Sequence, residues 1–150
     1  MSRTATAASL DESGPTNSLG AASADAPRLL GAAGRLRFLL VVGALLAAGA
    51  AHVAGDPTAY LQTDPKLGIL LRGMAVIKAM ISLAAMAALW WRFGRPIAPA
   101  TAAVYLVATW MTAGASMLVW QLWHIGVGAV AFHAGELTLL SVAWREHRAE

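Results

Sequence analysis

Residues 67–91, LGILLRGMAVIKAMISLAAMAALWW, decide the fold of this chain. The stretch carries only two charged residues, Arg72 and Lys78, and it exceeds the roughly 20 residues that a helix needs to cross the hydrocarbon core of a bilayer. A soluble helix of this length would present a polar face to water, and this stretch has no such face. It therefore predicts a membrane-spanning helix.

Three more apolar segments surround this stretch, so that spans are predicted at about 36–54, 67–92, 97–120 and 123–144. The chain of 150 residues is 58% hydrophobic and 13% charged, whereas a soluble domain is about 25% charged. We predict an all-α integral membrane bundle of four transmembrane helices over residues 28–150. Residues 1–27 are rich in Ser, Ala, Thr, Gly and Asp without an apolar period, which predicts a disordered cytoplasmic tail.

The basic residues set the expected orientation of the bundle. They cluster before the first span, between the second and third spans, and after the fourth: Arg28, Arg35, Arg37, Arg92, Arg95, Arg145 and Arg148. Short loops rich in Lys and Arg stay in the cytoplasm, so both termini are predicted to be cytoplasmic. The alanine-rich, cysteine-free composition is compatible with a bacterial inner membrane.

The first span admits a second interpretation. It ends in the small residues Ala48-Gly49-Ala50-Ala51, which resemble the cleavage site of a signal peptide. The long polar segment before the span argues against a cleaved leader, and we retain it as a transmembrane helix.

Small and polar residues at three- and four-residue spacing predict the inward faces of the helices, because membrane helices associate through small residues and interhelical hydrogen bonds. The predicted faces are Ala48, His52 and Gly55 in the first span; Ala75, Lys78, Ser82 and Ala85 in the second; Thr101, Tyr105, Thr109, Thr112 and Ser116 in the third; and Gly126, Ala129, His133 and Glu136 in the fourth.

Lys78 and Glu136 are the most informative residues, because a charge at a helix centre costs about 2.5–3.5 kcal/mol on insertion scales. Their similar depth suggests an ion pair, with His133 one turn from Glu136. One interpretation is a proton-handling or small-solute site in which Glu136 and His133 exchange protons and Lys78 is the counter-ion. Tyr105 and Thr109 would orient this network. The other interpretation is an ion pair that only fixes helix register in an accessory or anchor subunit.

The polar residues near the outer ends of the spans suggest a third hypothesis. His52, Arg72 and His124 all fall near the outer ends of their spans. Two histidines on different helices could ligate a b-type haem, with Arg72 beside a propionate, or the three residues could face quinone in a redox subunit. The methionines at positions 74, 80, 86, 111 and 117 could suggest copper, but their spacing spreads them around the helices. No other cofactor is expected.

The sequence also narrows the classes of site and of protein that remain possible. The chain has no cysteine, which excludes disulfides and thiolate sites. Neither a phosphate-binding glycine loop nor a nucleophile elbow is present, so an enzyme is the less favoured class. The net charge of +3 comes from arginines at span ends, which argues against a nucleic-acid partner. The expected partners are the lipid bilayer and either further copies of this chain or a larger membrane complex.

Overall fold

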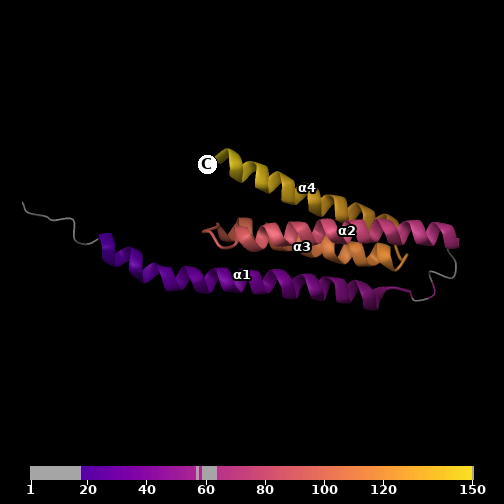
Figure 1. Ribbon diagram of the computed structural model, residues 1–150, viewed down its shortest axis with the longest axis horizontal. Coiled ribbons are helices and arrows are strands. Elements are labelled where there is room, and N and C mark those ends of the chain that lie inside the picture. Colours follow the sequence, from indigo (N-terminus) through magenta and orange to yellow (C-terminus); the bar gives the residue numbers. More distant parts are fainter. Residues whose placement is uncertain (1–17, 57, 59–63, 150) are drawn as a thin grey trace, which may run out of the picture.

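Among the residues that it describes, the computed structural model contains four helices, all of them long and apolar enough to cross a membrane (Figure 1). They are α1 (Ser18–Ala54), α2 (Pro65–Arg92), α3 (Pro99–Trp120) and α4 (Ile125–Ala149). The structure describes residues 18–56, 58 and 64–149, and the side chains of residues 31–56, 58 and 64–148. The predicted all-α fold with four transmembrane helices is confirmed, and the chain is a multi-pass membrane protein.

The first helix is longer than its predicted span. It begins at Ser18 and projects beyond the other three helices at its starting end (Figure 1). Its apolar portion is Gly31–Ala54. Residues 18–27, which the sequence analysis assigns to the tail, are thus part of a helix, and alanine, the best helix former, is frequent in them. Residues 1–17 of the predicted tail lie outside the described residues.

Local signals fix the start of α2. The Asp64 carboxylate accepts hydrogen bonds from the backbone N–H groups of Lys66 (2.9 Å) and Leu67 (3.2 Å), which is the usual role of an N-cap residue. Pro65 follows as the first helical residue, where its missing N–H costs nothing. Pro99 opens α3 in the same position.

A tight turn of residues 121–124 joins α3 to α4, and it is longer than the two residues predicted. Leu122 has φ 58°, its N–H bonds to Val119 O (3.1 Å), and the Trp123 N–H bonds to Leu118 O (3.2 Å). This pairing satisfies the last carbonyls of α3 in a Schellman arrangement. The helices are therefore antiparallel neighbours.

The third helix is the centre of the bundle. It packs against α1, α2 and α4, whereas α1 and α2 touch only marginally. Gly135 brings α4 close to α3, since a Cβ there would lie 2.9 Å from Ala108 O. Trp110 of α3 fills the space beside Gly43 of α1, and its indole N–H donates to Leu39 O (3.2 Å).

The observed inward faces agree with the sequence for α2 and α3, extend the predicted face of α1 and correct that of α4. Tyr105, Thr109, Thr112 and Ser116 of α3, and Ala75, Lys78 and Ser82 of α2, are buried. The buried face of α4 instead carries Gly128, Phe132, Gly135 and Leu139, and that of α1 carries Leu40 and Ala44. Close backbone packing against α3, rather than polar periodicity, sets the face of α4. On α1, Leu40 and Ala44 continue the predicted stripe of Ala48, whereas His52 is exposed.

Aromatic and basic residues mark both ends of the spans. We call the end that carries Arg37, Arg92, Arg95, Arg145 and Arg148 the basic end, and the end with Gly55, Asp56, Thr58, Asp64 and residues 121–124 the loop end. At the basic end the Arg37 guanidinium lies 5.3 Å from the Trp90 ring centre, and at the loop end Arg72 lies 5.7 Å from that of Trp120. Such pairs are typical of membrane interfaces.

Candidate functional site

Glu136 of α4 lies within a transmembrane span and lines a cavity of about 350 Å³ that reaches the basic end. Its Oε1 atom is buried and makes no hydrogen bond to any described residue. An unpartnered carboxylate oxygen away from water is costly. The cavity walls come from α2, α3 and α4 and include Leu89, Arg92, Tyr105, Glu136, Leu139 and Glu146.

A second carboxylate in the same cavity is fully engaged. Glu146 accepts from Arg92 Nη2 at Oε1 (2.9 Å), and at Oε2 from Arg92 Nε (3.3 Å) and the Tyr105 hydroxyl (2.8 Å). Forked arginine contacts of this kind are among the stronger ion pairs. Residues from α2, α3 and α4 therefore meet in one hydrogen-bonded cluster, which we call the basic-end clasp (Arg92, Tyr105, Glu146).

The two glutamates lie at different depths along α4. Ten residues of helix separate them, which corresponds to about 15 Å at about 1.5 Å per residue. Glu146 lies near the end of α4, whereas Glu136 lies well inside the span. Because both line one cavity, that cavity connects the inner carboxyl with the end of the bundle.

Lys78 is buried but is not in an ion pair with Glu136. Within the described part of the chain, the one pair of opposite charges within 4.0 Å joins Arg92 to Glu146. Lys78 instead places Nζ 4.0 Å from the centre of the Phe132 ring, a cation–π contact. Phe132 and Glu136 are one turn apart on α4, so Lys78 lies within electrostatic reach of the carboxyl without touching it.

The other residues of the predicted network do not all join it. Tyr105 is buried, but its hydroxyl donates to Glu146 and not to Glu136. Thr109 is fully buried and donates to Tyr105 O (2.8 Å), so its hydroxyl is used within α3. His133 is exposed on the surface of α4, with its ring edge-on to Phe132, and it lies within electrostatic reach of the Glu136 carboxyl, as Lys78 does.

The three residues of the predicted haem site have separate partners at the loop end. His52 is exposed, and its ring Nδ1 contacts the Gln121 side chain, which also donates to His52 O (3.1 Å). His124 lies against the ring of Trp123, and Arg72 lies over Trp120. Among the residues that the structure describes, no three His, Asp or Glu side chains gather in a group that could hold a metal ion.

Sequence reasoning missed Arg92 and Glu146 as site residues. Arg92 serves in the sequence only as a marker of orientation, and Glu146 is not singled out. A signal was present, since the chain places an arginine at the end of α2 and a glutamate near the end of α4, both on the same side of the membrane. The sequence does not contain the relative heights of α2, α3 and α4, which bring both side chains to the Tyr105 hydroxyl.

The sequence matches no protein-family model, and neither a curated protein nor a solved structure shows significant similarity to it.

Proposed function

We propose that this protein handles protons, alone or coupled to a small solute, and that Glu136 is the group that takes up and releases the proton. The observation that carries this proposal is the contrast between two glutamates in one cavity. Glu146 has partners at both oxygens, whereas the buried oxygen of Glu136 has none among the described residues. A carboxyl without fixed partners can change its protonation state without breaking a network.

The position of Glu136 supports the same role. Ionisable residues inside membrane spans are expensive, and they commonly mark ion or proton pathways. The cavity gives Glu136 a route to the basic end. Lys78 supplies a positive charge within electrostatic reach, which would stabilise the ionised carboxylate after the proton leaves.

The proposal includes an orientation. The basic end would face the cytoplasm, with both termini on that side of a bacterial inner membrane, because the arginines cluster there. Glu136 would then exchange its proton with the cytoplasmic side through the cavity. The basic-end clasp would hold α2, α3 and α4 together at the mouth of that route.

Proton flux in liposomes tests the proposal. Purified protein is reconstituted with a pH-sensitive dye trapped inside, and a potassium gradient with valinomycin imposes a membrane potential. We expect the wild-type protein to acidify the lumen and Glu136→Gln, which keeps the side-chain volume but cannot exchange a proton, to match empty liposomes. Thr138→Val on the exposed side of α4 is the control and should behave as wild type.

Either of two results would contradict the proposal. One is wild-type flux no greater than that of empty liposomes at good protein incorporation. The other is full flux in Glu136→Gln, which would remove the carboxyl from the pathway.

A further inference from the structure

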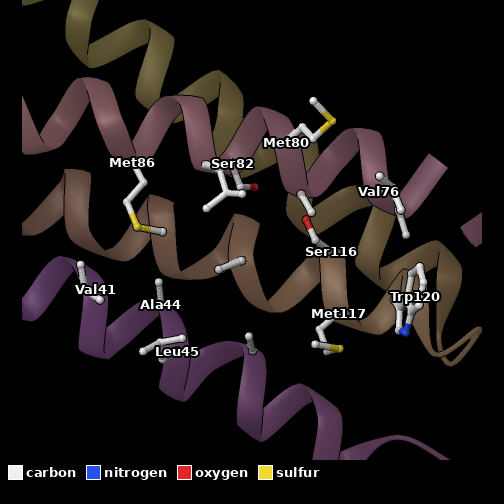
Figure 2. A pocket seen from close by; sticks show the side chains of 15 residues that line it. Val41, Ala44, Leu45, Val76, Met80, Ser82, Met86, Ser116, Met117 and Trp120 are labelled. Carbon is white, nitrogen blue, oxygen red and sulfur yellow. The ribbon is translucent and has the colours of Figure 1, made fainter. Parts of the chain in front are cut away.

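The cavity beside Glu136 has charged residues at both of its ends. Its walls follow one face of each helix at three- and four-residue spacing: Ala85, Ala88 and Arg92 of α2, and Glu136, Leu139, Ala143 and Glu146 of α4. The cavity therefore extends along both helices, with Arg92 and Glu146 at its basic end. A larger cavity of about 660 Å³ between α1 and α2 differs, because none of the described side chains that line it is charged (Figure 2).

The last turns of α4 are packed less tightly than its middle. Gly128 and Gly135 bring the first part of the helix against the backbone of α3. None of residues 140–148 is buried, although Val142 packs partly against the core. In keeping with this, α4 diverges from α2 and α3 towards this end (Figure 1). The end of α2 is anchored instead, because Leu89 and Phe93 are buried, so the last turns of α4 form the less constrained wall of the cavity.

The basic-end clasp ties this part of α4 to the rest of the bundle. The backbones of α2 and α4 hardly approach each other, so Arg92 and Glu146 bridge the two helices through their side chains. Arg92 also donates to Pro96 O (3.3 Å), which holds its guanidinium on the α2 side. The side chains of Arg92 and Glu146 are 28% and 25% exposed. Water can therefore compete for this pair, which allows the clasp to open and to form again.

We infer that residues 140–148 of α4 form a gate, which swings on the close contact of Gly135 with α3 and which the basic-end clasp holds shut. With the clasp formed, its three side chains separate the inner part of the cavity from water at the basic end. When Glu146 releases Arg92, the last turns of α4 move away from α2 and water enters the inner part. The gate thereby controls access to Glu136, a role that rests on the proposed function.

The reactivity of a single cysteine inside the cavity tests the gate, since the chain has no cysteine of its own. Ala85→Cys places a thiol in the cavity wall, about two turns inward of Arg92. The full chain is held in lipid nanodiscs, and a charged methanethiosulfonate reagent that does not cross lipid is added. We expect labelling about threefold to tenfold faster when Tyr105→Phe removes one hydrogen bond, and more than about tenfold faster when Glu146→Gln removes the ion pair.

A cysteine in the other cavity is the matched control. Ala79→Cys lines the cavity between α1 and α2, and its labelling should stay equally slow with the clasp intact and in Glu146→Gln. The gate is refuted by equal labelling of Ala85→Cys with and without Glu146→Gln, or by faster labelling at both cysteine positions. Faster labelling of Ala85→Cys alone, in a protein whose wild type carries no proton flux, would support the gate and contradict the proposed function.

Spin-label distances measured by double electron–electron resonance identify the part that moves. Labels at Arg95→Cys and Arg145→Cys, both exposed positions at the basic end, should gain a longer distance component in Glu146→Gln. The pair Arg95→Cys and Val130→Cys should keep its distance, because Val130 precedes the contact at Gly135 and is exposed. An unchanged distance for the first pair, or equal lengthening of both, would overturn the proposed swing of α4.

Discussion

At the scale of single residues, identical side-chain types meet different environments in this protein. Glu146 is held by Arg92 and Tyr105, whereas Glu136 has a buried oxygen without a partner. Lys78 rests on an aromatic ring instead of a carboxylate. These differences in environment, rather than residue type, separate the side chains that hold the helices together from the side chain without a fixed partner.

The Lys78–Phe132 contact should carry measurable free energy. A desolvated cation–π contact contributes up to about 2 kcal/mol, and Lys78 is buried. In a double-mutant cycle of Lys78→Met and Phe132→Leu, we expect a coupling of about 1–2 kcal/mol in the free energy of unfolding. Unfolding in mixed micelles with an ionic detergent provides the measurement. Additive effects of the two substitutions would show that the ring does not stabilise the ammonium group.

Asp56, outside the spans, should titrate below its ordinary range. Hydrogen bonds from the Thr58 hydroxyl (2.7 Å) and the Thr58 backbone N–H (2.8 Å) hold the pKa of the Asp56 carboxyl below 3.8. Because the folded pKa is lowered, the stability that this turn contributes is present above pH 3.8 and is lost as the pH falls through the folded pKa.

Carbon-detected NMR of the Asp56 carboxyl checks this expectation. Thr58→Ala removes the hydroxyl bond and keeps the backbone bond, so the pKa should rise partway towards 3.8. Identical titration curves for wild type and Thr58→Ala would contradict the assigned cause.

At the scale of helices, α3 is the common partner of the other three. Whether the sequence could predict each contact depends on the kind of residue that makes it. The faces of α2 and α3 follow from their polar stripes, because Lys78, Tyr105 and Thr112 point inward. On α4 the polar residues predict the wrong face, since Gly135 makes the close contact with α3 and His133 is exposed. Shape complementarity between two backbones depends on both helices at once, and one sequence pattern does not encode it.

The α3–α4 contact provides a sharp test at this scale. A Cβ at Gly135 would lie 2.6 Å from Thr112 Cγ2 and 2.9 Å from Ala108 O, so Gly135→Ala must push the helices apart. We expect a loss of about 1–3 kcal/mol in the free energy of unfolding, as for other overpacked sites. Gly126→Ala, on the same helix with nothing within 4 Å of its Cβ, should be neutral or slightly stabilising. Equal effects of both substitutions would refute the proposed packing.

At the scale of the whole molecule, hydropathy predicted the four spans, because lipid imposes their length directly on the sequence. The orientation that the arginines indicate stays a prediction. The basic-end clasp could not be predicted in the same way. It depends on the relative heights of three helices, which bring Arg92, Tyr105 and Glu146 to one point.

The orientation can be measured with single cysteines, since the chain has none of its own. We expect a membrane-impermeant maleimide to label Thr58→Cys at the loop end in intact spheroplasts. Arg95→Cys at the basic end should react only after permeabilisation. The unmodified chain is the control for background. Labelling of Arg95→Cys in intact spheroplasts would reverse the proposed orientation.

Proton exchange at Glu136 can be followed by infrared titration of the protein in lipid. A carboxylic acid band that is absent from Glu136→Gln belongs to this residue. We expect that band to appear and disappear reversibly as the bulk pH is cycled, and to persist in the Thr138→Val control. A Glu136 band that keeps the same intensity at every pH at which the protein stays folded, or that never appears, would contradict the proposed exchange.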